Sequence, residues 1–241
     1  PQIPALLEYV SETPRCTCLA KDDASVRMVE HILSALSGLG VNNAHIEVEG
    51  PEIPASDGSA LEFVQMIERA GIRSLEAPRR SIYIEKAMYW SQGDCHLIAL
   101  PSEGFRISYT LHYPQSTLIR SQYCSFFMTE ELYRREIAPC RTFSLYEEIA
   151  PLLEKGVLKG GGLDKGLVIQ GDQILNPEGS RFFDEMVRHK VLDLIGDLSL
   201  VGFPFVAHIV AIRSGHTSHR AFAQKICNAF NVENPDGGHD S

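Results

Sequence analysis

The segment from residue 183 to residue 201 most constrains the fold of this chain. Its apolar side chains recur every three or four residues, and the run stops at Gly202, so we expect a helix with one buried face. His189, Asp193 and Asp197 lie at four-residue spacing within it, which puts them on one helix face. An imidazole and a carboxylate at this spacing can bind one metal ion. The alternative is a solvated polar stripe with an ordinary His–Asp pair, and the strongly apolar flanks leave both interpretations open.

A second helix is predicted over Val26–Leu39, where apolar residues follow the same spacing. It contains the sequence MVEH, ending at His31, and the first helix contains the similar MVRH, ending at His189. The two histidines could therefore face each other across a pseudo-symmetric core. Glu30 and His31 diverge by about 100° on a helix. This suits a histidine ligand with a carboxylate beside the metal, and it equally suits a surface glutamate next to a satisfied histidine.

Shorter helical and strand-like segments alternate along the rest of the chain. Ser59 and Glu62 have the spacing of a helix-capping box, ahead of a helix ending near Gly71, and another helix is predicted over 219–230. Strands alternating with helices in both halves indicate an α+β fold. Apolar runs and apolar–polar alternation predict strands at residues 44–49, 81–85, 105–111, 167–170 and 206–212, and the first ten residues also look like a strand.

Ala77-Pro78, followed by two arginines, makes the best domain boundary. It divides the chain into a first domain, residues 1–77, and a second domain, residues 78–233. Within the second domain, residues 144–175 contain a helix, a glycine-rich loop (Gly160–Gly162) and a strand, a pattern typical of a surface excursion. The tail, residues 234–241, has the composition of a disordered segment.

Charge and composition exclude several classes of function. The 31 acidic residues outnumber the 22 basic ones, giving a net charge of −9, and no long basic run provides the footprint of a nucleic-acid-binding protein. The longest apolar stretch, 198–212, is interrupted by polar residues and proline and is too short for a membrane span. Six scattered cysteines and the lack of a secretory pattern indicate a reduced, cytoplasmic protein.

Two further residues are suited to acid–base or oxyanion chemistry. His216 follows a glycine in the turn after the last apolar strand, where a histidine can be held over a cleft at a pKa suited to proton transfer. An ordinary loop histidine is the alternative. Thr142 begins the excursion and could offer its hydroxyl to a developing oxyanion, although on spacing alone a structural threonine is the stronger alternative.

In this order, these segments resemble the UDP-3-O-acyl-N-acetylglucosamine deacetylase family, the zinc enzymes of lipid A biosynthesis. Family members begin several strands earlier than Pro1, so we expect the first domain to lack its N-terminal strands. The resemblance extends from Thr13 to about Ile226 and rests on residues 29–43 (VEHILSALSGLGVNN), 51–54 (PEIP), 57–60 (DGSA), 140–143 (CRTF), 189–190 with 193, 196–198 (GDL) and 214–216 (SGH).

The resemblance implies a two-domain β-α-α-β sandwich, with the helices of the two domains packed against each other and the active site between them. Zinc would be bound by His31, His189 and Asp193, an open site of two histidines and one carboxylate. The excursion would form an apolar passage for the substrate's acyl chain. The other implied roles are Glu30 as general base on the attacking water, His216 as general acid oriented by Asp197, Thr142 in polarising the amide carbonyl, and Lys190 and Phe143 in binding substrate.

We therefore expect a cytoplasmic, monomeric zinc amidohydrolase that removes the N-acetyl group from UDP-3-O-acyl-N-acetylglucosamine, the committed step of lipid A biosynthesis. Its partner would be this small-molecule substrate, with no nucleic acid and no membrane span. A truncated homologue that binds zinc or acyl-UDP-sugar without turnover is one alternative, and a zinc amidohydrolase for another acylated amino sugar is the other. Cys16 and Cys18 would lie on a loop near the metal cleft, either binding a second, inhibitory metal or buried and inert.

Overall fold

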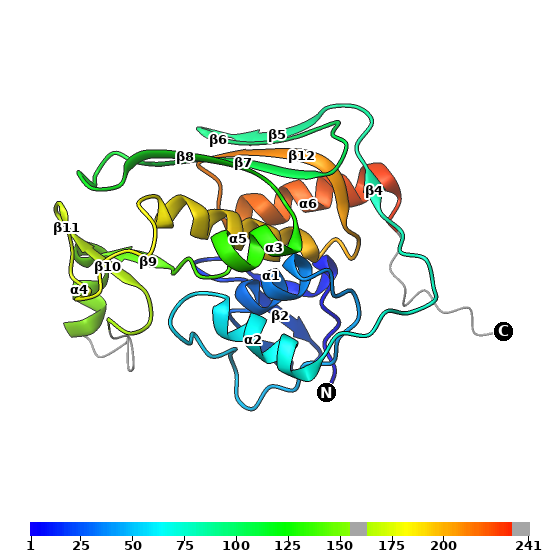
Figure 1. Cartoon of the computed structure of the whole chain (residues 1–241), viewed down its shortest axis with the longest axis horizontal. Helices are drawn as coiled ribbons and strands as arrows, with labels where there is room; N and C mark the ends of the chain where they lie inside the picture. Colours follow the sequence, from blue (N-terminus) through cyan, green and yellow to red (C-terminus); the bar gives the residue numbers. More distant parts are fainter. Residues whose placement is uncertain (155–162, 233–241) are drawn as a thin grey trace.

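The structure, a computed structural model, describes residues 1–154 and 163–232 (Figure 1). Two layers of helices lie between a large sheet and a three-stranded sheet from the N-terminal part of the chain. The predicted α+β fold is confirmed, with six α-helices and three sheets among the described residues. Within these ranges, no helix combines the length and the apolar composition that a bilayer-spanning segment requires. The domain boundary at residue 77 stays a prediction.

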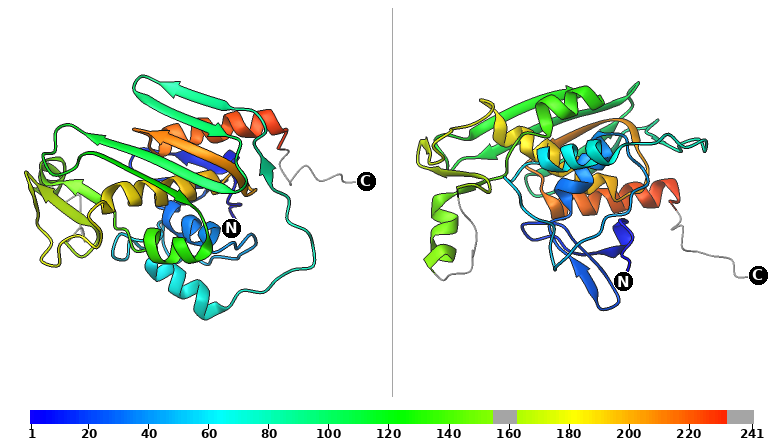
Figure 2. Two further views of the ribbon diagram at one scale, coloured as in Figure 1. Left: turned by 45° about the horizontal axis from the view of Figure 1, so that its top comes forward. Right: turned by 60° about the horizontal axis from the view of Figure 1, so that its bottom comes forward.

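The first sheet and its two helices are built from the N-terminal part of the chain (Figure 2). Its strands are antiparallel in the order β1-β2-β3, and the short 3-10 helix η1 precedes them. Helix α2 buries Phe63 and Val64, and α1 buries Leu33 and Ala35. The bounds are η1 Leu7–Tyr9, β1 Val10–Glu12, β2 Cys18–Lys21, β3 Ala24–Val26, α1 Glu30–Gly38 and α2 Leu61–Ala70.

The large sheet covers α5 and α6 (Figure 1). Its strand order is β5-β6-β12-β7-β8, with β4 paired to β12. Alternate residues of β12 are buried, because only one face of the sheet packs on the helices. The bounds are β4 Ile82–Tyr83, β5 Met88–Gln92, β6 Cys95–Leu100, β7 Phe105–Tyr113, β8 Arg120–Phe127, α3 Glu130–Leu132, the π-helix η2 Tyr133–Ile137, α5 Glu185–Ser199, β12 Phe205–Ile212 and α6 His216–Phe230.

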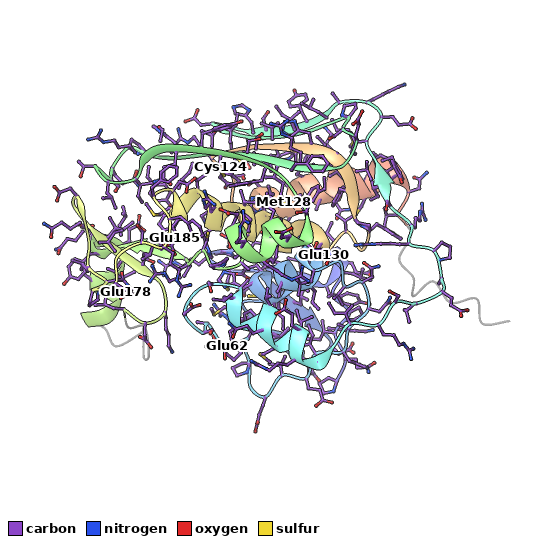
Figure 3. The ribbon with its side chains drawn as sticks, in the orientation of Figure 1. Glu62, Cys124, Met128, Glu130, Glu178 and Glu185 are labelled. Carbon is purple, nitrogen blue, oxygen red and sulfur yellow. The ribbon has the colours of Figure 1, made fainter. Side chains whose placement is uncertain are left out.

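A third, small sheet forms the described part of the predicted excursion. Its order is β11-β10-β9, with β9 Phe143–Leu145, α4 Tyr146–Glu154, β10 Leu167–Gln170 and β11 Gln173–Ile174. The buried Arg141 guanidinium anchors it: Nε lies 2.9 Å from Glu185 and Nη1 lies 2.6 Å from Glu178, both labelled in Figure 3. Gly160–Gly162 and the predicted disordered tail, 234–241, lie outside the described residues.

Two predicted helix starts differ from the structure. Helix α1 begins at Glu30 rather than at Val26, because residues 24–26 form β3 and Met28 adopts a left-handed φ of 59°. Helix α6 begins at His216 rather than at residue 219, because the Ser218 hydroxyl accepts the N–H that precedes the helix and closes its first turn.

The predicted capping box of α2 is wrong. The Ser59 hydroxyl donates to Asp57 Oδ1 at 2.6 Å and accepts the Leu61 N–H at 3.2 Å. The Glu62 carboxylate instead accepts a hydrogen bond from the Ser56 hydroxyl. A loop held by Asp57 therefore replaces the reciprocal Ser–Glu pair. The predicted end of the helix at Gly71 is confirmed.

Two strand predictions are also wrong. Residues 44–49 form no strand, and both Ile46 and Val48 are exposed, because no described strand pairs with them. Residues 1–6 form no strand either, and the chain enters the first sheet only at β1, after η1. The other predicted strands are present as β4, β7, β10 and β12.

The contact between α1 and α5 depends on a glycine. At Gly196 the α5 backbone lies against the backbone of Glu30, and a Cβ at this position would overlap the Glu30 carbonyl. The absence of a side chain therefore allows the two helices to approach closely. This contact confirms that helices from the two halves of the fold pack against each other.

Replacing Gly196 by alanine is expected to lower the free energy of unfolding by about 1–3 kcal/mol, because the added methyl overpacks the helix contact. Denaturant unfolding of the two proteins measures this change. Gly215→Ala is the matched control, because Gly215 has an extended backbone and open space where its Cβ would lie. Equal losses in the two variants would contradict the assigned role of Gly196.

Candidate metal centre and active site

The α1–α5 contact brings three candidate metal ligands together. His31 lies in the first turn of α1, His189 and Asp193 lie one turn apart on α5, and all three are buried. Asp193 Oδ1 is 3.1 Å from His189 Nε2 and 3.5 Å from His31 Nε2. The imidazole rings meet edge to face, with centroids 5.0 Å apart. The two histidines therefore face each other, as their matching sequence contexts predict.

The donor atoms of this group fit a metal ion. Asp193 Oδ1 is the single buried side-chain oxygen or nitrogen of the described residues without a hydrogen bond. His189 Nδ1 donates to the Cys140 carbonyl at 3.0 Å, which leaves the Nε2 lone pair facing the Asp193 oxygen. Two lone pairs this close repel each other unless a cation lies between them. Two imidazoles and one carboxylate are the ligands of an open zinc site.

Charge and burial favour the metal-binding protonation states of Asp193 and His189. Burial opposes ionisation of Asp193, but His189 and Lys190 together hold its pKa well below the usual value. Burial lowers the pKa of His189, which favours the neutral ring. Lys190 Nζ donates to Asp193 Oδ2 at 2.8 Å. One carboxylate oxygen is therefore occupied by the lysine, and the other is left for a metal.

Glu30 lies beside the ligand group rather than within it. It is the first residue of α1 and is buried, and its Oε2 accepts the Thr17 N–H at 2.9 Å. Its Oε1 is 3.9 Å from His216 Nε2. Burial raises the pKa of Glu30, and the nearby histidines offset only part of this effect. A carboxylate held this way, with one free oxygen and a raised pKa, is suited to general-base chemistry.

His216 and Asp197 form a hydrogen-bonded pair across the gap from Glu30. His216 Nδ1 is 2.8 Å from Asp197 Oδ2. Burial opposes a charge on His216, but the carboxylates of Asp197, Asp193 and Glu30 outweigh it and raise its pKa to about 10. Burial likewise opposes ionisation of Asp197, and its histidine partners lower its pKa below the usual value. The pair is thus an imidazolium held by a carboxylate.

A second group, Asp197, His216 and His219, also has its ligand atoms close enough to hold a metal ion. Here, however, Nδ1 of each histidine lies within hydrogen-bond distance of the same oxygen, Asp197 Oδ2, at 2.8 and 2.6 Å. The other oxygen accepts the Thr17 hydroxyl at 2.6 Å. Both oxygens of Asp197 therefore already accept hydrogen bonds. These hydrogen bonds explain why the three side chains lie together, without a metal ion.

Three further predicted residues are linked to the metal-ligand group by sequence or by contacts. Thr142 follows two residues after Cys140, which accepts the His189 hydrogen bond, and its N–H donates to the Gly58 carbonyl at 2.8 Å. Lys190 Nζ, already paired with Asp193, lies 5.7 Å from the centre of the Phe143 ring. The structure thus brings Lys190 to Asp193 and Phe143 to Lys190, while Thr142 is connected to the group through the nearby Cys140. The roles of all three stay predictions.

Thr17 and His219 are site residues that the sequence analysis missed. The backbone N–H of Thr17 binds Glu30 and its hydroxyl binds Asp197, so one residue joins the two acid–base groups. No sequence pattern indicates that either residue belongs to the site, because their partners lie far away in the sequence.

Cys16 and Cys18 lie on either side of Thr17, with their sulfur atoms 3.7 Å apart. Burial raises the pKa of the Cys18 thiol to about 11, which favours the inert interpretation over a metal-binding thiolate.

Three buried candidate metal ligands, a neighbouring carboxylate and a histidine–aspartate pair lie together at one helix contact of an α+β sandwich. This arrangement is typical of a metal-assisted hydrolase. The family model described as UDP-3-O-acyl N-acetylglycosamine deacetylase matches residues 1–228. The chain belongs to this family. The resemblance inferred from the sequence is thereby confirmed, and so is its assignment to the hydrolytic deacetylases.

Curated relatives named UDP-3-O-acyl-N-acetylglucosamine deacetylase agree with the family assignment. The protein of Chlamydia pneumoniae is 48% identical over 230 residues, which cover 95% of this chain and 82% of the relative. The protein of Chlamydia felis is 47% identical over 225 residues, covering 93% and 80%. That of Chlamydia trachomatis is 45% identical over 231 residues, covering 96% and 81%.

Proposed function

We propose that this chain hydrolyses the N-acetyl group of a UDP-3-O-acyl-N-acetylglucosamine, giving the free amine and acetate. The observation that carries the proposal is Asp193 Oδ1, a buried oxygen without a hydrogen bond that faces two histidine nitrogens. Glu30 and His216 adjoin this group. The names of the relatives supply the substrate. The step of lipid A biosynthesis follows from the family resemblance described above.

His31, His189 and Asp193 would hold a zinc ion, which when bound would polarise the acetamide carbonyl and make water easier to deprotonate. Glu30 takes the proton of the attacking water on Oε1, because Oε2 is held by the Thr17 N–H. The raised pKa of Glu30 brings its basicity closer to the operating pH.

His216 acts as the general acid. Asp197 holds its Nδ1, so the Nε2–H points toward Glu30 and can reach the departing nitrogen. The positive ring also offsets negative charge that develops on the carbonyl oxygen, and the Thr142 hydroxyl assists there. Lys190 and Phe143 contact the substrate from the side of the small sheet, with Lys190 also supporting Asp193.

The acyl chain lies against the element formed by α4 and the small sheet. The Phe143 ring packs on Tyr113 with centroids 5.4 Å apart, and Tyr146 and Leu163 expose apolar surface on this element. We propose a monomer, because the proposed zinc ligands, base and acid account for the reaction without a residue from a second chain. Six cysteines without disulfide partners support a location in the reducing cytoplasm.

Zinc content and acetate release, measured on the whole chain, test the proposal. We expect one zinc per chain and acetate from the acylated UDP-sugar, with slower release from the same sugar lacking the acyl chain. Zinc binding without acetate release would instead indicate a non-catalytic homologue. Equal rates on the two sugars would indicate an amidohydrolase with a different substrate.

Turnover is expected to fall at high pH as His216 loses its proton. The pKa of His216 is raised to about 10, so the acid form is present below this pH and disappears above it. In Asp197→Asn the ring loses its carboxylate partner, and the alkaline limb should move down by about two pH units. The pH dependence of kcat, measured on both zinc-loaded proteins, checks this. An unmoved limb would show that another group titrates there.

A further inference from the structure

Asp197 is the centre of a buried polar network that the proposed mechanism uses only in part. Its Oδ2 lies 2.8 Å from His216 Nδ1 and 2.6 Å from His219 Nδ1, and its Oδ1 accepts the Thr17 hydroxyl at 2.6 Å. His219 is completely buried in α6. The mechanism accounts for His216, but it assigns nothing to the second histidine on the same oxygen.

The other side of the His219 ring reaches the large sheet. His219 Nε2 is 2.9 Å from the hydroxyl of Ser214, just beyond the end of β12. The same hydroxyl is 3.0 Å from the hydroxyl of Tyr109, a fully buried residue of β7. The Tyr109 hydroxyl in turn donates to the Ser214 carbonyl at 2.6 Å. A chain of buried polar groups therefore runs from the sheet through His219 to Asp197.

The number of available protons determines the direction of these hydrogen bonds. Ionised Asp197 can only accept, so His219 Nδ1 must carry a hydrogen. The Tyr109 proton is used on the Ser214 carbonyl, which leaves the Ser214 hydroxyl with one proton and two neighbours, Tyr109 and His219 Nε2. The geometry allows the Ser214 hydroxyl to donate to the Tyr109 hydroxyl, but His219 would then have to be a buried cation that donates from Nε2 to Ser214. Burial lowers the pKa of His219, so the neutral ring with Ser214 donating to Nε2 is the consistent arrangement.

We propose that His219 is a positioning residue: its Nδ1–H holds the Asp197 carboxylate against His216, and the Ser214 hydroxyl selects the ring tautomer that can do so. This inference rests on the proposed function, in which the Asp197–His216 pair supplies the acid. A carboxylate oxygen with two N–H donors, and a second oxygen with one O–H donor, cannot rotate without losing a buried bond. His219 thus fixes the direction in which Asp197 presents its charge to His216.

Side-chain nitrogen NMR on the zinc-loaded wild-type chain, labelled with 15N at histidine, tests the tautomer directly. His219→Asn identifies the His219 signals by their loss. We expect a neutral ring with hydrogen on Nδ1 and none on Nε2. A ring with hydrogen on Nε2, whether neutral or charged, would overturn the proposal. This measurement needs no turnover, so it remains decisive even if the chain fails to deacetylate and the proposed function is wrong.

Amide substitutions test the positioning role. Asn places an N–H donor at the position of Nδ1, whereas Gln places it near the position of Nε2. We expect kcat to fall about 10- to 100-fold in His219→Leu, with KM little changed, and to recover in His219→Asn but not in His219→Gln. Equal activity of the Asn and Gln variants, or wild-type kcat in His219→Leu, would overturn the proposal.

His208→Leu is the matched control. His208 also has its Nε2 near a serine hydroxyl, Ser108 at 2.8 Å, but it lies in β12 and bonds no carboxylate. The His208→Leu variant should retain wild-type kcat. A fall in kcat equal to that of His219→Leu would show that removing any histidine hydrogen-bonded to a serine impairs the enzyme. This result too would overturn the proposal.

Discussion

Replacing Glu30 by glutamine is expected to lower kcat for acetate release about 100- to 10,000-fold, the range that a general base contributes. The amide has nearly the shape of the carboxylate, and its oxygen can still accept the Thr17 N–H. What it loses is the ability to take a proton on the free oxygen. Zinc should remain bound, because Glu30 lies beside His31, His189 and Asp193 and contributes no atom to that group.

Turnover and zinc content of the purified variant check both parts of this expectation. Glu62→Gln is the matched control, since Glu62 also lies in the first turn of a helix but is exposed and bonds only Ser56 (Figure 3). The control should keep wild-type kcat. Retained turnover in Glu30→Gln would mean that another group removes the proton, and lost zinc would mean that Glu30 belongs to the metal site.

The parts of the site that lie within one helix could be predicted from the sequence. His189 and Asp193 are four residues apart in an apolar helix, so helix geometry alone places them together, and the structure puts their nitrogen and oxygen 3.1 Å apart. The similar MVEH and MVRH sequences added the position of His31, because two helices packed in a sandwich bring equivalent residues together. The first is a local pattern, which helix geometry alone converts into a contact. The second is a repeated sequence, which points to two equivalent positions in the fold.

Contacts between distant segments that share no repeated sequence could not be predicted in this way. Thr17 reaches Asp197 across 180 positions and His219 reaches it across 22, and neither threonine nor histidine at these places stands in a recognisable pattern. The strand predicted at residues 44–49 fails for the same reason, because its formation also depends on a contact with a distant segment. Its alternation is genuine, but a strand needs a partner for its backbone, and no described strand pairs with it.

Replacing Asp193 by asparagine is expected to remove zinc and abolish turnover. The variant loses the only negatively charged ligand of the group, and Lys190, which donates to Oδ2 of Asp193, loses its counter-charge. The affinity for zinc should fall by more than about 100-fold, beyond the effect typical of residues that only support a ligand. Zinc titration of the metal-free wild-type and variant proteins measures this directly.

Asp197→Asn is the matched control, because Asp197 is one turn further along α5 and has the same chemistry, yet its oxygens are bonded to Thr17, His216 and His219. It should keep zinc and show only a reduced kcat, with the shifted pH dependence predicted above. Zinc also stabilises the folded state, by about 4 kcal/mol at a free concentration 1,000 times Kd, so a chelator should lower the Tm of the wild type and of Asp197→Asn but not that of Asp193→Asn. The opposite pattern, with zinc lost from Asp197→Asn and kept by Asp193→Asn, would place the metal in the second group and leave the unbonded Asp193 oxygen without an explanation.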